Sequence, residues 1–60
     1  MREFAIYMIN TDLVTVIEAA EWEIEDNTFL IFYDNQKNTI SVFNMKNIAG
    51  FKEIMDDESE

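Results

Sequence analysis

The sequence has no cysteine, no histidine and no proline, and only one glycine among its 60 residues. Without cysteine the fold cannot be held by disulfides, and without cysteine and histidine it lacks the usual ligands of a structural zinc site. A domain of this size buries only about 60% of the surface that its unfolded chain exposes, so its stability is marginal. Burial of apolar side chains must therefore hold the fold, and formation of a homodimer would strengthen it.

The missing histidine and cysteine also remove the side chains on which most acid–base and nucleophilic catalysis depends. The two serines, Ser41 in an apolar segment and Ser59 near the C-terminus, have no identifiable base beside them. No glycine-rich loop is present to hold a phosphate, and no spaced Asp/Asn/Gly loop is present to hold calcium. We therefore expect a protein that is not an enzyme and that binds no cofactor and no metal.

Basic residues are scarce, with 4 lysines and arginines against 13 acids and a net charge of -9. Such a charge repels nucleic-acid phosphates and anionic lipids, so it disfavours direct binding to DNA, RNA or a membrane surface and favours a protein partner with a basic surface. The apolar run over residues 4–9 is too short for a secretory signal or a membrane span. We expect a cytoplasmic location.

β-Branched and aromatic residues recur along the chain and predict an all-β fold. Residues 2–9 are apolar on both alternating faces, as expected for a strand that is covered on both sides. Residues 13–20 match either a strand or the first turns of a helix over residues 12–23. Four consecutive β-branched residues, Val14 to Ile17, favour the strand, and Ala19-Ala20 then marks a bend in one long strand.

The middle of the chain predicts a three-strand meander whose strands and loops lie at residues 21–25, 26–28, 29–33, 34–38 and 39–43. These loop lengths gather one wholly apolar face, made by Trp22, Ile24, Leu30, Phe32, Ile40 and Val42. The other face then holds acidic side chains beside mostly apolar ones: Glu21, Glu23, Glu25, Phe29, Ile31, Tyr33, Ser41 and Phe43. A slip of one residue would exchange the two faces, so this register is specific.

The C-terminal part of the chain predicts a turn over residues 44–47 and a last strand over residues 48–55. A short helix from Met45 onwards is the alternative. Gly50, the single glycine, is expected at a bulge or at a point where another backbone approaches closely. Residues 56–60 are charged and lack apolar anchors, so we expect them to be a disordered acidic tail.

Together these segments predict a single small β domain over residues 1–55. It would contain four or five antiparallel strands in a meander that forms a twisted sheet or a small barrel. The alternative is an α+β fold with one helix over residues 12–23.

Two sets of residues are candidates for binding. The first is an acidic strip, formed by Glu18, Glu21, Glu23, Glu25 and Asp26, which is either a solvated strand face or an imitation of a nucleic-acid backbone. The second is an apolar set of interface candidates, formed by Phe29, Ile31, Tyr33 and Phe43. The alternative for the second set is that the terminal strands fold over it and bury it.

Between Thr15 and Ile54 the segments follow in this order: a tryptophan-bearing acidic strand, a short turn, Leu-Ile-Phe-Tyr, a polar loop, Ser-Val-Phe-Asn and Ile-Ala-Gly-Phe. This order resembles that of very short all-β accessory proteins encoded by bacteriophages and mobile elements. The resemblance implies a stoichiometric inhibitor of a bacterial defence or nucleic-acid-processing protein, acting as a homodimer in the host cytoplasm. The alternatives are a structural subunit of an oligomer and an acidic regulator that mimics DNA.

Overall fold

The structure is a computed structural model that describes residues 1–55, so the expected disordered tail at 56–60 lies outside the described residues. The described part consists of strands and one short 3-10 helix: β1 (Arg2–Met8), β2 (Val14–Ala19), β3 (Glu21–Glu25), β4 (Phe29–Tyr33), β5 (Thr39–Asn44), η1 (Met45–Asn47) and β6 (Ile48–Ile54). The all-β prediction is confirmed. The alternative helix over residues 12–23 is wrong, because β2 and the start of β3 occupy that segment.

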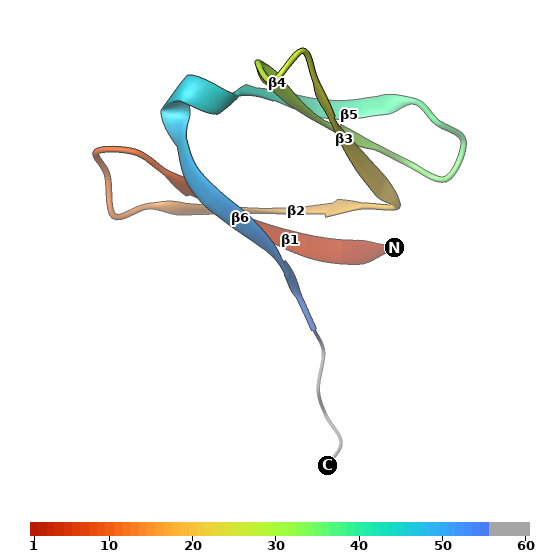
Figure 1. The fold of residues 1–60 in the computed structure, drawn as a ribbon. Helices are drawn as coiled ribbons and strands as arrows, with labels where there is room; N and C mark the ends of the chain where they lie inside the picture. The colour runs from red at the N-terminus through yellow and green to blue at the C-terminus, as the bar shows by residue number, and fades with distance from the viewer. Residues whose placement is uncertain (56–60) are drawn as a thin grey trace.

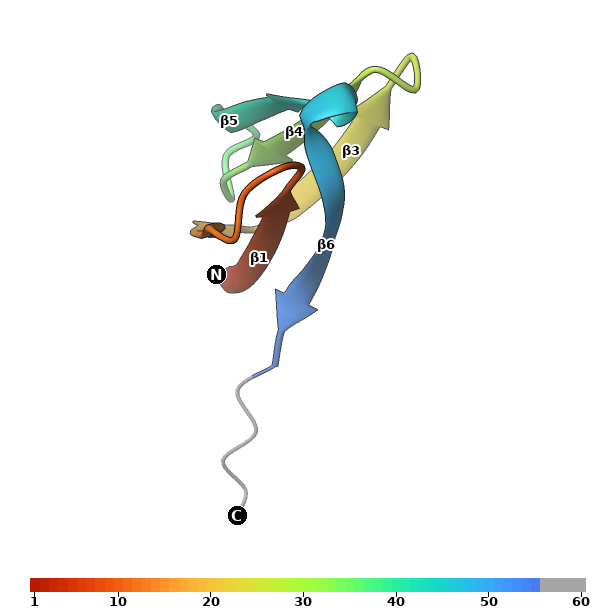
Figure 2. The ribbon, with the colours of Figure 1, turned by 90° about the vertical axis from the view of Figure 1, so that its left-hand side faces the viewer.

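The strands form two antiparallel three-stranded sheets, which we call the first sheet (β2-β1-β6) and the second sheet (β3-β4-β5). Figure 1 shows them as a lower and an upper layer, joined at one end by the passage from β2 to β3 and at the other by η1. Figure 2 shows β6 descending from η1 to lie alongside β1. The second sheet is a meander, whereas the first is completed by the last strand, and the two sheets do not close into a barrel.

The bend at Ala19-Ala20 carries the chain from one sheet to the other. Ala19 is fully buried, and the backbone N–H of Ala20 donates a hydrogen bond to the carbonyl of Tyr33 at 2.8 Å. Small side chains fit this corner because the two sheets meet there. The bend also changes which alternate residues face the core. Before it the odd-numbered residues Ile17 and Ala19 face the core, and after it the even-numbered residue Trp22 does.

The first hairpin of the second sheet has the predicted register. Ile24 lies opposite Leu30, and the three-residue loop over 26–28 is confirmed. Asp26 and Asn27 both have positive φ, 57° and 53°, and the N–H of Thr28 closes the turn on the carbonyl of Glu25 at 2.9 Å. Asp and Asn are the residues besides glycine that tolerate this left-handed conformation, so the sequence encodes the turn locally.

The predicted register of the second hairpin is wrong by one residue. Tyr33 lies opposite Thr39 as the five-residue loop requires, but Phe32 then pairs with Ser41, which leaves Ile40 as the extra residue of a bulge. Beyond the bulge every side chain of β5 is on the other face from the one predicted. Phe43 faces the core opposite Leu30, and the side chains on either side of it face outward.

The core lies between the sheets and is centred on aromatic rings. Its buried members are Phe4, Ile6, Ala19, Leu30, Phe32 and Ile48. The ring of Phe32 has Phe4, Phe43 and Phe51 around it, at centroid distances of 5.2, 6.0 and 6.1 Å. Tilted and edge-on aromatic pairs at these distances add to the apolar burial that a chain without disulfides depends on.

The core side of the edge strand β3 is only partly covered. Trp22 and Ile24 were expected in the core, but they are 42% and 41% exposed because no strand of residues 1–55 flanks β3 on its outer edge. Trp22 nevertheless packs edge-on against Phe51 of the first sheet, with 5.0 Å between the ring centroids. This contact links the two sheets where they are most open.

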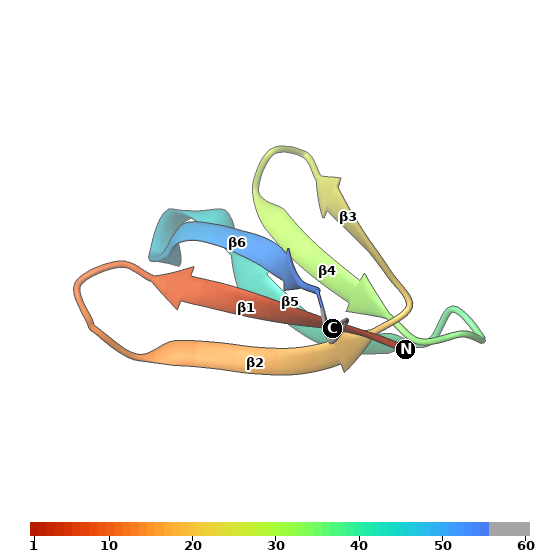
Figure 3. The ribbon, with the colours of Figure 1, turned by 90° about the horizontal axis from the view of Figure 1, so that it is seen from below.

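No element of residues 1–55 covers the outer face of the first sheet, so the expected two-sided burial of residues 2–9 is wrong except at Ala5, which its neighbours on that face leave only 5% exposed. Phe4 and Ile6 face the core, whereas Tyr7 on the outer face is 36% exposed. Figure 3 views the molecule from this side, with β2, β1 and β6 foremost. The predicted bulge near Gly50 is confirmed, since the β1–β6 register shifts after the Tyr7–Gly50 pair.

Candidate interaction surface

The outer side of the second sheet brings most of the predicted binding residues together. The register arranges them in three rows across β3, β4 and β5, which are Glu21–Tyr33–Thr39, Glu23–Ile31–Val42 and Glu25–Phe29–Asn44. With strands about 4.8 Å apart and same-face residues about 6.6 Å apart, the nine Cα positions span about 10 by 13 Å. We call this surface the acidic–apolar face, because β3 supplies its acids and β4 its apolar side chains.

Exposure divides the apolar side chains of this face into a floor and its surroundings. Ile31, in the centre, is only 8% exposed because the side chains of its own row and of the neighbouring rows cover it. Phe29 is 40% and Val42 is 53% exposed. Of these three residues, Phe29 and Val42 present apolar surface to a partner, and Ile31 supports them from below.

The acids of β3 act electrostatically on Tyr33. Partial burial is the first cause that raises the pKa of the Tyr33 phenol above its ordinary value of 10.0, and the negative charges of Glu23 and Glu25 are the next. The hydroxyl group therefore stays protonated at neutral pH and can donate a hydrogen bond. A neutral donor beside two carboxylates suits a partner that presents both acceptors and cations.

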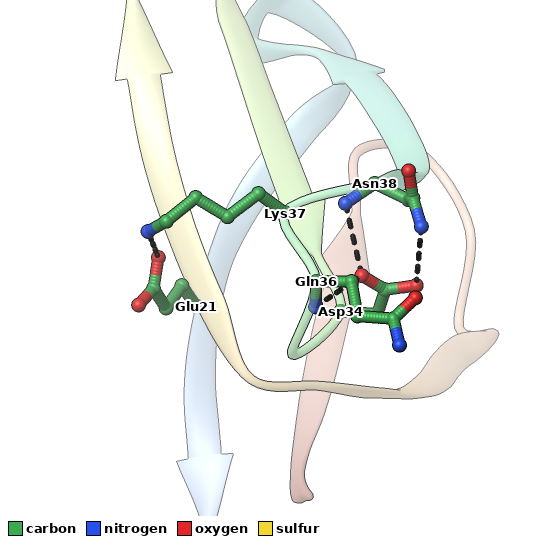
Figure 4. A network of polar contacts seen from close by, with 5 residues as sticks. All are labelled: Glu21, Asp34, Gln36, Lys37 and Asn38. Atoms are coloured by element: carbon green, nitrogen blue, oxygen red, sulfur yellow. Dashed lines mark hydrogen bonds and ion pairs between the residues drawn. The ribbon is translucent and has the colours of Figure 1, made fainter.

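The loop at the end of this face is held by its own polar contacts (Figure 4). The Asp34 carboxylate accepts hydrogen bonds from the backbone N–H groups of Gln36 at 2.8 Å and Asn38 at 2.9 Å. The hydrogen bond from the Asn38 backbone is the main reason that the pKa of Asp34 is lowered from its ordinary value. The closure places Lys37 at a φ of 67°. Its ammonium group lies 3.3 Å from a carboxylate oxygen of Glu21.

The Lys37–Glu21 pair leaves the negative charge of the face concentrated at Glu23 and Glu25. Within residues 1–55 neither of these two forms an ion pair. The Lys37–Glu21 pair itself is well exposed and contributes little to stability. The acidic end of the face is therefore available to cations of another molecule.

The remaining predicted site residues lie elsewhere. Glu18 faces outward on the first sheet, opposite Glu3, because the bend at Ala20 separates it from the β3 glutamates. Asp26 is in the hairpin turn beyond Glu25. Phe43 packs inward against Phe32, so its predicted position on the binding face is wrong.

Val42 is the apolar residue of the acidic–apolar face that sequence reasoning placed in the core. The error follows directly from the bulge at Ile40, which turns β5 over by one residue. A signal was present in the loop before it, where Asp34 is followed at short spacing by Gln36 and Asn38. Such residues form side-chain-to-backbone turns that fix the loop independently of the strand that follows.

The acidic–apolar face combines three carboxylates with one phenol and apolar side chains. No group of three or more metal-ligating side chains occurs within the part of the chain that the structure describes. The same residues, 1–55, contain no helix long and apolar enough to cross a bilayer. Comparison of the chain with models of protein families, with curated proteins and with solved structures gives no match.

Proposed function

We propose that this protein is a non-enzymatic binding module that docks onto another protein through its acidic–apolar face. The observation that carries the proposal is the exposure of Phe29 and Val42 around the floor residue Ile31, on a sheet face bordered by glutamates. Apolar side chains at the centre and charge at the edge are the usual arrangement of a protein–protein interface. Burial of such a surface is favourable in proportion to the apolar area removed from water.

The arrangement specifies the complementary surface. A partner would offer an apolar patch to Phe29 and Val42, and Lys or Arg side chains along one border at intervals of about 6 to 7 Å, the spacing of alternate residues in a strand. Glu23 and Glu25, which make no ion pair within residues 1–55, would receive those cations. Tyr33 would contribute a hydrogen-bond donor between the apolar and acidic parts.

The resemblance to short phage accessory proteins supports a narrower role. It points to a stoichiometric inhibitor in the cytoplasm of a bacterial host, aimed at a defence or nucleic-acid-processing protein. A protein that handles nucleic acid carries basic surface for the phosphates, and that surface would attract this acidic chain and steer its approach. Occupation of the surface blocks the target without any chemistry by the inhibitor.

The test begins with a partner captured from bacterial lysate on the immobilised protein and identified by mass spectrometry. The affinity of that purified partner is then measured for the wild type, for Phe29→Ser and for the control Leu13→Ser. Leu13 is an exposed apolar residue between β1 and β2, outside both sheet faces. We expect Phe29→Ser to weaken binding at least tenfold and Leu13→Ser to leave it unchanged. Equal affinities of all three proteins would show that the partner binds elsewhere.

A charge-matched pair examines the acidic border. Glu23→Gln and Asp12→Asn each remove one negative charge, the first from the acidic–apolar face and the second from the exposed loop between β1 and β2. If the border contacts the partner, the first weakens binding and the second does not. Repeating the measurement over a range of salt separates docking from imitation of DNA. Apolar docking loses little affinity as salt rises, whereas electrostatic mimicry loses it steeply.

A further inference from the structure

The outer side of the first sheet is a second uncovered face with a different composition. Its rows across β2, β1 and β6 are Glu18–Glu3–Ile54, Val16–Ala5–Lys52 and Val14–Tyr7–Gly50. Val14 and Val16 are 46% and 54% exposed. We call this surface the valine–glycine face. Unlike the acidic–apolar face it carries both signs of charge, and Lys52 forms no ion pair within residues 1–55.

Gly50 is a residue that the single chain does not require. Its φ is not in the left-handed region, and a Cβ built on it would have no neighbouring heavy atom within 4 Å. The ring of Tyr7, opposite it on β1, therefore does not lie over it. Glycine within a strand weakens the strand, because it has the most backbone freedom to lose and no side chain to pack. The gap that it leaves is open to a side chain from outside.

We propose that a second copy of this chain occupies the valine–glycine face, related to the first by a two-fold axis parallel to β1. This axis places β2 of each copy over β6 of the other and keeps the rows in line. Val14 then lies over the gap at Gly50 of the second copy. Val16 of the first copy lies over the methylene stem of Lys52 of the second copy. The ammonium group of that lysine reaches Glu18 of the first copy, which lies one row away, about 6.6 Å along β2.

The distribution of charge selects this occupant. Each copy brings one lysine and two glutamates to the contact, and the two-fold axis places each Lys52 beside Glu18 and near the axial Glu3 of the other copy. A pair of acidic–apolar faces would instead bring six glutamates together with no cation among the nine residues of either face. Contact between one face of each kind would be head-to-tail and would extend without closing.

A dimer would have to use the whole of this face. A specific interface needs at least about 1,000 Å² in total, hence about 500 Å² per copy. That is roughly one ninth of the 4349 Å² surface of this chain. Three strands of six or seven residues have a flat projection of about 14 by 20 Å, or about 280 Å², so the contact must also include the side chains that project from the face. Closure at two copies leaves both acidic–apolar faces outermost, so the dimer can bind two partners.

The decisive variant is Gly50→Val, read by sedimentation and light scattering over 1 to 100 µM, about the range of moderate dimer affinities. The wild type is expected at twice the chain mass of 7.1 kDa. Valine favours strands, and its Cβ would have no heavy atom within 4 Å apart from those of its chain neighbours, so the variant should fold and unfold at an equal or higher temperature when both proteins are monomeric. It should nevertheless remain a monomer at 100 µM, because it fills the gap that Val14 needs.

A pair of charge-reversal variants distinguishes loss of the dimer contact from a folding defect. Lys52→Glu should abolish the dimer, and the double variant Lys52→Glu/Glu18→Lys should restore it, because the reversed charges meet again across the two-fold axis. Phe29→Ser on the acidic–apolar face is the control and should stay dimeric. The proposal is overturned by a wild type of 7 kDa at 100 µM, by masses that keep growing with concentration, or by a Gly50→Val dimer as tight as the wild type. A dimer lost only in Phe29→Ser also overturns it.

The two proposals fail separately. If Gly50→Val is a folded monomer that binds the captured partner with wild-type affinity per chain, the valine–glycine face serves self-association alone. If the dimer forms as described and no partner recognises the acidic–apolar face, only the proposed function is lost.

Discussion

The adjacent residues Val42 and Phe43 give the sharpest test of the observed register, because the bulge at Ile40 decides which of them supports the core. Phe43 is partly buried and its ring meets Phe32 edge-on at 6.0 Å. Truncation of a fully buried Phe to Ala costs about 3 to 5 kcal/mol, so Phe43→Ala should lower the free energy of unfolding by about 2 to 3 kcal/mol. Val42 is 53% exposed, and Val42→Thr keeps its shape, so this change should stay within about 0.5 kcal/mol.

These differences are large for so small a protein. At about 0.05 to 0.15 kcal/mol per residue, the whole domain is stable by roughly 3 to 9 kcal/mol. At about 4 to 8 °C per kcal/mol, Phe43→Ala should lower the unfolding midpoint by about 10 to 20 °C, and Val42→Thr by only a few degrees.

The measurement is thermal and urea unfolding followed by circular dichroism. All proteins are compared at one concentration, because association would make the midpoint depend on concentration. The register predicted from the sequence, with Val42 inward, gives the opposite order. A larger loss for Val42→Thr than for Phe43→Ala would therefore refute the bulge and the acidic–apolar face built on it.

Four further predictions concern the core, a turn and two ionisable groups. Phe32→Ala removes the ring at the centre of the aromatic cluster, at a cost of about 3 to 5 kcal/mol, and should leave much of the protein unfolded at 25 °C by circular dichroism; a cooperative transition at the wild-type temperature would contradict this. Asn27→Val forces a β-branched residue to a φ of 53° and should destabilise the fold by about 1 to 2 kcal/mol, whereas Asn27→Gly should not. The pKa of Asp34 is lowered in the folded state. The stability that Asp34 contributes is therefore present above its ordinary pKa of 3.8 and is lost as the pH falls through the folded pKa. Asp34→Asn should reduce the loss of unfolding free energy at acid pH. Tyr33 has a raised pKa, so its contribution is present below 10.0 and is lost as the pH rises through the folded value; the difference between the alkaline absorbance titrations of the wild type and Tyr33→Phe should show a phenol that ionises above 10.0.

The sequence was sufficient where the determining interactions are local. Alternation of acids with Trp22 and Ile24 predicted β3, and the turn residues Asp26 and Asn27 fixed the loop length and hence the pairing of β3 with β4. These features depend on a few neighbouring residues and on the two-residue period of a strand. Three acids and three β4 residues of the binding face followed from them.

The sequence was insufficient where two distant requirements compete. The five-residue loop closed by Asp34 would turn Val42 inward, and the core instead takes the ring of Phe43. The bulge at Ile40 reconciles the loop with the core, and the alternation of residues within β5 does not indicate it. The outer side of β1 is uncovered for a similar reason, because residues 1–55 contain no further element that could lie over Tyr7.

The pairing of β1 with β6 has a consequence for how the molecule is made. The hairpins of the second sheet join residues that are close in sequence. β1, the central strand of the first sheet, also pairs with β6, whose residues are as distant in sequence as Ile54. Pairings of such long sequence separation slow folding, because a long loop closes before its contacts stabilise it. During synthesis the apolar residues of β1 leave the ribosome first and remain without β6 until nearly all of residues 1–55 has followed. Folding is therefore a late event, and aggregation in that interval is the hazard that the excess of acidic residues counteracts.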